Sequence, residues 1–471
     1  MLVAHKPSSL SRSYDMPQEI TDLFVYAIAQ HLDPKSSRQS LISCTMVSRS
    51  FSLPARRQLY SAVHVSYFKQ GNGPTDKQAP KYSLFKSLKE KLEGPTNFGS
   101  LIRKVHIDVS QSLIPLADDV ELHSVFSALR IHSLNVDCFW MTGNNDTTWW
   151  SDMSLEIICL LASWTQLAKI RISHVRDLTM DFLPSLSVVS CLELVSIHFN
   201  NSASLEERDL DSEVTKPLQL HELFVHRSHD GFQEFRNRLQ LDLSSLRRFQ
   251  MSIFDRNEAL IFSAIIQGSF KSLQLLDLYV NLSFSAATCI LRKHLFSMLY
   301  GTDNKFLKGG IINIGNFSNL RKLRLRIQTG IQQIFPSMSD IFSLLHPPSK
   351  YPTRLEAIEL LFNSIRGPGR PPQIFAPDTM NDSDADAWRS LHPTVLRQPH
   401  PNLRSLYLCL DLMIMKLPSW APIDSSLIRD AEGVLAGKFK AYIEGSSEAI
   451  DRDILAWDIH AVAWENDFVR K

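Results

Sequence analysis

A six-residue pattern of apolar and polar positions recurs through most of the chain. Its first, fourth and sixth positions are aliphatic or aromatic, so its second half alternates at the two-residue period of a β-strand. The five clearest copies begin 25, 28, 26 and 27 residues apart. They are Leu167, Ile170, Ile172; Leu192, Val195, Ile197; Leu220, Leu223, Val225; Leu246, Phe249, Met251; and Leu273, Leu276, Leu278.

Further copies lie on both sides of these five. They are Ile102, Val105, Ile107; Ile131, Leu134, Val136; Leu320, Leu323, Leu325; Leu355, Ile358, Leu360; and Leu403, Leu406, Leu408. The intervals of the central copies resemble those of leucine-rich repeats, in which each unit supplies a strand and stacks on its neighbours. Such repeats also favour Asn eight residues after the first leucine, where Asn200, Asn281 and Asn363 stand. We therefore expect an α/β fold with an irregular leucine-rich-repeat solenoid, and an irregular α/β domain is the alternative.

The N-terminal region instead has the longer period of amphipathic helices. One helix is predicted from Pro17, with Glu19 in its first turn, and a second runs to Arg49 after the break at Asp33-Pro34. A third is expected to begin near Pro54. Because these helices carry more apolar residues than they can bury among themselves, we expect part of them to contact another polypeptide.

Residues 16–65 resemble the F-box, in the F-box-like form common at the N-terminus of fungal proteins. The matching residues are Met16, Pro17, Glu19, Ile20; Leu32, Asp33, Pro34; and Val47, Ser48, Arg49, Phe51. Methionine replaces the family's leucine and phenylalanine its tryptophan, and both changes keep an apolar side chain of similar bulk.

In that family the helices bind Skp1, the adaptor of a cullin-based ubiquitin ligase. The resemblance implies a substrate-recognition subunit of an SCF-type (Skp1–cullin–F-box) ligase in the cytosol or nucleus, with no catalytic residues of its own. The implied adaptor contacts are Met16, Pro17, Ile20, Leu23, Leu32, Leu41, Val47 and Phe51. Two alternatives remain open: a helical cap on a larger fold, and a non-catalytic repeat scaffold that no longer binds the adaptor.

Composition shifts and the two periodicities predict the domain boundaries. At the C-terminus, residues 427–443 have the pattern of an amphipathic helix, followed by a second apolar stretch that includes Trp457 and Trp464. We expect a disordered segment 1–15, an F-box-like domain 16–65, a linker and capping segment 66–98, a repeat array 99–415 with a mobile loop at about 366–390, and a helical cap 416–471.

Charge and cysteine usage exclude several classes of function. The net charge of +1 indicates neither nucleic acid nor an anionic membrane as a partner. No apolar run is long enough to cross a bilayer. The six cysteines are widely spaced, as expected for buried thiols rather than disulfides or a zinc site.

The chain has no phosphate-binding loop and no nucleophile elbow, so we expect no enzyme activity and no cofactor. His221, Glu222 and His226 look like a shortened zinc-protease motif, but they lie in a predicted strand, where the two histidines would face opposite ways.

Target binding is instead expected at the polar positions between the core residues of each copy. The candidates are Arg171, Arg324 and Arg326, the last two in a basic group with Arg321 and Lys322. A solvated strand edge is the alternative explanation of that group. Trp149 and Trp150 are further candidates, because aromatic residues are enriched at binding hot spots.

Overall fold

The computed structural model describes residues 17–31, 34–67, 98–110, 131–139, 167–175, 188–197, 218–226, 241–254, 256–281, 314–329, 353–366, 393–416 and 455–465, with a few isolated positions between them. The chain divides into two compact units, and among the described residues the boundary falls between Leu167 and Ala168. No helix in these ranges is long and apolar enough to cross a membrane.

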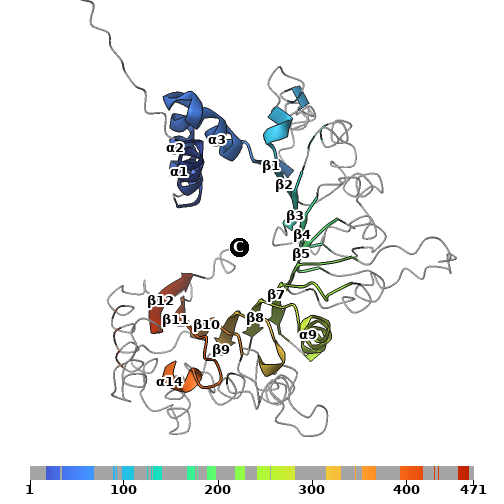
Figure 1. Ribbon diagram of the computed structural model, residues 1–471, viewed down its shortest axis with the longest axis vertical. Helices are drawn as coiled ribbons and strands as arrows, with labels where there is room; N and C mark the ends of the chain where they lie inside the picture. The colour runs from blue at the N-terminus through green and yellow to red at the C-terminus, as the bar shows by residue number, and fades with distance from the viewer. Residues whose placement is uncertain are drawn as a thin grey trace, which may run out of the picture. The chain divides into compact units, whose positions relative to one another are not determined.

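Three helices open the first unit: α1 (Gln18–His31), α2 (Pro34–Val47) and α3 (Arg49–Leu59) (Figure 1). The carbonyl of Pro17 accepts the first helical N–H groups of α1, and the hydroxyl of Ser48 caps α3. The first two predicted helices are confirmed. The third begins at Arg49, so the prediction that it starts near Pro54 was wrong.

Pro54 lies inside α3 and has no N–H to donate to the carbonyl of Ser50. The side-chain amide of Gln18, on α1, donates to that carbonyl at 3.3 Å. The two helices are therefore joined at the point where the proline interrupts the hydrogen bonds of α3.

The small core of the helices contains Val25, Leu41, Cys44 and Ala55, with Phe51 packed against it. Each helix contributes to this cluster, which holds the three together.

The first unit also contains three strands, β1 (Ala62–Tyr67), β2 (Lys104–Ser110) and β3 (Ser133–Phe139). The short 3₁₀ helix η1 (Phe98–Leu101) precedes β2. They pair in parallel, Val63 opposite Val105 and Val105 opposite Leu134. The sheet therefore includes residues 62–67, which we had assigned to the helical module and to a linker.

The second unit consists of parallel strands paired in chain order, as Figure 1 shows. They are β4 (Lys169–Ser173), β5 (Cys191–Val195), β6 (Glu222–His226), β7 (Arg248–Ile253), β8 (Leu275–Asn281), β9 (Lys322–Thr329), β10 (Ala357–Arg366), β11 (Ser405–Lys416) and β12 (Leu455–Glu465). Between them lie α9 (Arg256–Ser269), η4 (Ile314–Asn316) and α14 (Pro393–Leu396).

Helix α9 packs on one face of this sheet, against β7. Phe262 of α9 stacks on Phe249 of β7, with ring centroids 5.7 Å apart. Because side chains alternate along a strand, Arg248 and Gln250 lie on the other face, which we call the outward face.

One buried row crosses strands β4–β11 on the α9 side. Its members occupy equivalent positions of consecutive strands: Ile170, Leu192, Leu223, Phe249, Leu276, Leu323, Ile358 and Leu406. The recurring apolar pattern thus predicted parallel strands correctly, and the chain has the predicted mixed α/β architecture behind three N-terminal helices.

The second of the five central copies was placed in the wrong register. Leu192 pairs with Ile170 rather than with Leu167, so the copy is Val189, Leu192 and Leu194, and the first two intervals become 22 and 31 residues. A shift by an odd number of residues exchanges the two faces of a strand. The expected register would have exposed Leu194, which is buried. In the observed register the position eight residues after the start of the copy is Ile197, so the place assigned to Asn200 was wrong.

The expected C-terminal helical cap is wrong for residues 455–465. They form β12, which pairs in parallel with β11 along its whole length, Trp457 opposite Leu408. Leu455, Trp457 and Ile459 alternate with other residues at the period of a strand, which the richness in apolar residues concealed.

Several predicted segments lie outside the described residues. These are the N-terminal segment 1–15, the greater part of the linker, the loop at about 366–390 beyond Arg366, and the helix 427–443 apart from three isolated positions.

Candidate interaction surfaces

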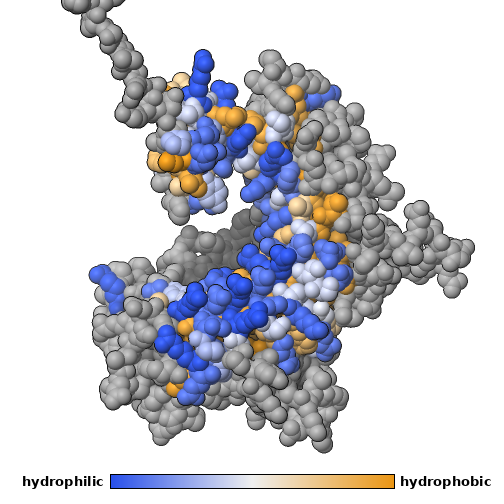
Figure 2. Space-filling model, viewed as in Figure 1, coloured by the Kyte–Doolittle hydropathy of each residue, from blue (hydrophilic) through white to orange (hydrophobic). Residues whose placement is uncertain are grey.

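The helices expose large apolar side chains to an unusual degree. Met46 is 83% exposed, Val47 71% and Leu23 68%, and the others are Ile20, Phe24, Tyr26, Ile42, Leu53 and Tyr60. Among the described residues only Val188 is a comparably exposed large apolar residue outside the helices. Figure 2 shows hydrophobic residues among hydrophilic ones on the surface of the three helices. We call these nine residues the apolar helix patch.

Most of the predicted adaptor contacts that the structure describes are accessible. Pro17, Ile20, Leu23 and Val47 are exposed, and Phe51 is half-buried, with its ring edge-on to Phe24 at 5.9 Å. Met16 and Leu32 lie outside the described residues.

Leu41 must be withdrawn from the predicted contacts. It is only 4% exposed and belongs to the core that holds the helices together. Conversely, Phe24 and Met46 are exposed apolar residues of the same helices that the predicted set did not include. Helical periodicity alone does not show which of two apolar stripes faces the core, because each helix here is apolar on more than one side.

The outward face of β4–β10 carries charged side chains that pair across strands. Glu193 on β5 accepts a hydrogen bond from Arg171 on β4, with Oε1 and Nη1 2.7 Å apart, and its second oxygen lies 3.3 Å from the Lys169 ammonium. The side chains of Glu222 and Arg248 form a looser pair at 4.0 Å. Figure 2 shows hydrophilic residues gathered along this face of the second unit.

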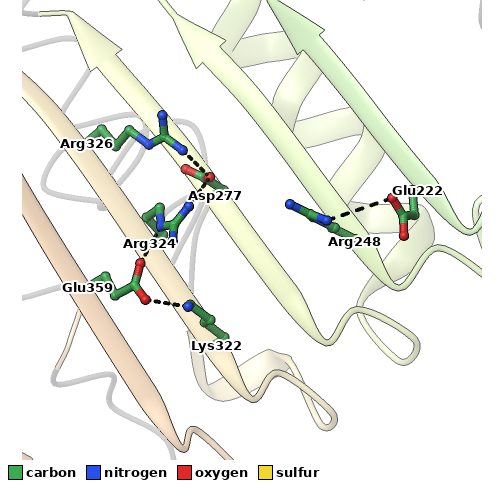
Figure 3. A network of polar contacts seen from close by, with 7 residues as sticks. All are labelled: Glu222, Arg248, Asp277, Lys322, Arg324, Arg326 and Glu359. Atoms are coloured by element: carbon green, nitrogen blue, oxygen red, sulfur yellow. Dashed lines mark hydrogen bonds and ion pairs between the residues drawn. The ribbon is translucent and has the colours of Figure 1, made fainter. Parts of the chain in front are cut away.

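Asp277 belongs to the largest charge network among the described residues, in which Arg324 joins Asp277 to Glu359 (Figure 3). The Asp277 side chain is only 3% exposed, and its Oδ2 lies 2.8 Å from Arg326 and 3.4 Å from Arg324 on the neighbouring strand β9. Arg324 and Lys322 both pair with Glu359 on β10. The network thus connects β8, β9 and β10.

These pairs shift the ionisation of their members. Burial by itself would lower the pKa of Arg324 and raise that of Glu359. The hydrogen bonds and the charge attraction outweigh burial, so the pKa of Arg324 is raised and that of Glu359 is lowered. Both groups are held in their charged forms.

An aromatic group lies on the same face. The Phe224 ring of β6 lies 5.0 Å from the Arg248 guanidinium and 5.6 Å from the Lys169 ammonium, as in cation–π contacts. Tyr279 lies beside His226 and Phe254 and donates a hydrogen bond to Gln328. Sequence reasoning did not single out Phe224 or Tyr279, although Phe224 stands at a polar position of the repeated pattern and Tyr279 directly follows a copy of it.

The predicted target-binding arginines all lie on the outward face, and all three are ion-paired. The basic group that the sequence indicated around Arg324 is therefore partly neutralised by Asp277 and Glu359. Trp149 and Trp150 lie outside the described residues.

No arrangement typical of a metal centre is found where side chains are described. No three His, Cys, Asp or Glu residues of that part of the chain converge on one point. His226 instead contacts the hydroxyl of Ser252. The described cysteines Cys44, Cys191 and Cys409 are buried free thiols, and burial raises the pKa of Cys191 to about 12.

A scan against models of known protein families and a search among curated proteins gave no match to this chain.

Proposed function

We propose that this chain is a substrate-recognition subunit of an SCF-type ubiquitin ligase, with an F-box-like helical module and a degenerate leucine-rich-repeat array. The helices would bind a Skp1-like adaptor, and through it a cullin, while the outward face of the strands binds a target protein. Such a subunit works by positioning its target, and we place it in the cytosol or nucleus.

The apolar helix patch is the observation that carries this proposal. Three short helices that expose nine large apolar side chains leave a surface that water solvates poorly, and such surfaces mark binding sites. Burying each of these side chains in an interface contributes of the order of 1 kcal/mol to the free energy of binding. The patch also includes Ile20 and Val47, which belong to the F-box-like motif.

The parallel strands support the second half of the proposal. Each repeated copy places its apolar residues on the α9 side and its polar residues outward, so stacking buries one face and leaves the other for a partner. Of the four intervals between the five central copies, as the structure corrects them, those of 22, 26 and 27 residues lie within the range of leucine-rich repeats, and the interval of 31 residues exceeds it.

A binding experiment with purified Skp1 tests the proposal. The full chain should retain Skp1, and Leu23→Glu or Val47→Glu should weaken binding at least tenfold because each places a charge in the interface. Val188→Glu is the matched control, since it makes the same change at an exposed apolar residue outside the helices. Circular dichroism checks that every variant is folded.

Two results would contradict this assignment. A folded wild-type chain without affinity for Skp1 would leave a non-catalytic repeat scaffold as the better description. Equal losses of binding in all three variants would show that the helix patch is not the contact surface.

A further inference from the structure

Positive charge exceeds negative charge on the outward face of β4–β10. We count the outward strand positions and, at the edge of the sheet where the strands begin, the residue directly before each strand. The cations there are Lys169, Arg171, Arg247, Arg248, Arg321, Lys322, Arg324 and Arg326, and the anions are Glu193, Glu222, Asp277, Glu356 and Glu359. This surface is therefore clearly cationic, whereas the chain as a whole has a net charge of only +1.

The carboxylates of this face are already committed to cations. Glu193, Asp277 and Glu359 are each shared between two basic side chains. Glu222 and Glu356 each pair with one arginine. A basic partner would have to displace these intramolecular cations, which makes its binding unfavourable.

Three of the arginines remain available to a partner, and Arg247 among them is exposed without an ion pair to any described residue. The Arg248 side chain is 43% exposed and lies 4.0 Å from Glu222, and that of Arg321 is 63% exposed and lies 3.8 Å from Glu356. Both distances exceed those of a hydrogen bond. Neither guanidinium donates a hydrogen bond to any described residue, and the Nε of Arg248 is buried without an acceptor.

We infer that the outward face of β6–β9 binds an acidic, extended segment of a partner protein, whose carboxylates pair with Arg248 and Arg321. The inference rests on the proposed function, because it assigns a chemical class to the target that the strands would hold. A carboxylate fits the forked N–H groups of an arginine, and such charge-assisted hydrogen bonds are stronger than neutral ones.

The spacing of the two arginines suits such a segment. Arg248 begins β7, and Arg321 directly precedes β9, two strands away. Neighbouring strands are about 4.8 Å apart, so the two guanidinium groups arise from strands about 10 Å apart, which about three residues of extended chain can span. Phe224 and Tyr279 lie on the same face and can contact apolar parts of the segment.

Fluorescence anisotropy with a labelled peptide tests the inference. The probe is a glutamate-rich peptide of about ten residues with one central phenylalanine, long enough to cross β4–β10. A lysine-rich peptide of the same length serves as the control of opposite charge. Arg248→Ala combined with Arg321→Ala should weaken binding of the acidic peptide roughly tenfold. Lys271→Ala combined with Arg397→Ala removes two exposed cations from other parts of the second unit and should leave binding within about twofold.

Three results would overturn the inference: no binding of the acidic peptide by the folded chain, tighter binding of the lysine-rich peptide, or equal weakening by both double variants. Failure here is distinguishable from failure of the proposed function. A chain that binds Skp1 but not the acidic peptide refutes only the inference. A chain that binds the peptide but not Skp1 refutes the ligase proposal and leaves the acidic-segment site in place.

Discussion

Asp277 shows how a single buried charge depends on its neighbours. Its carboxylate is almost inaccessible to water, yet two arginines that are only partly buried reach it from the next strand. Removing one member of a buried ion pair leaves the other charges poorly compensated, which is costly even when the intact pair adds little stability.

We therefore expect Asp277→Asn to lower the free energy of unfolding by about 2 kcal/mol. Glu222→Gln makes the same chemical change in the loose, half-exposed pair with Arg248 and should cost at most about 0.5 kcal/mol. Urea denaturation of both variants measures the difference. Equal costs would show that the burial of Asp277 has no energetic consequence.

Glu359 gives the stability of the second unit a dependence on pH. Its pKa in the folded protein lies below the ordinary value of 4.5 because Arg324 and Lys322 donate to it. A carboxyl group with a lowered folded pKa stabilises the protein above its unfolded pKa, and this contribution disappears as the pH falls through the folded value.

The wild type should consequently be more stable than Glu359→Gln at about pH 7, and the two should converge below about pH 4.5. Urea denaturation at a series of pH values tests this. A difference that stays constant on acidification would show that the ion pairs of Glu359 contribute nothing.

At the scale of elements, α2 carries two apolar residues with opposite roles. Leu41 lies in the core of the three helices, whereas Val47, at the end of the same helix, is exposed. Both were predicted to contact an adaptor, because their apolar character is visible in the sequence and their orientation is not.

Leu41→Ala should reduce the stability of the helical module by about 2–4 kcal/mol, since it leaves a cavity in a small core. Val47→Ala, at an exposed position, should stay within about 0.5 kcal/mol. Thermal unfolding followed by helical circular dichroism checks both. A destabilising Val47→Ala would show that this residue is covered in the free protein.

The strands show where a repeating pattern suffices and where it does not. Most copies were placed correctly because only one register buries their three apolar residues. The segment from Val188 to Ile197 contains so many apolar residues that the pattern fits it in two registers. The observed register is the one in which Glu193 pairs with Arg171 on the neighbouring strand. Such long-range pairing leaves no trace in the local sequence.

At the scale of the whole molecule, the order of its parts was predictable and their surfaces were not. Helices followed by parallel strands could be recognised from two apolar periodicities. The aromatic group around Phe224 and the charge network around Asp277 each combine residues from several strands that are distant in the sequence. Only the order and register of the strands bring them together.

The proline inside α3 has a consequence for how the three helices unfold. One carbonyl of that helix lacks its usual internal donor and takes one from Gln18, near the start of α1. The hydrogen bonds of the first turns of α3 are thus completed by a residue of α1, 32 positions earlier in the sequence. We expect α1 and α3 to be lost together on denaturation, as one cooperative transition, rather than to fray independently from their ends.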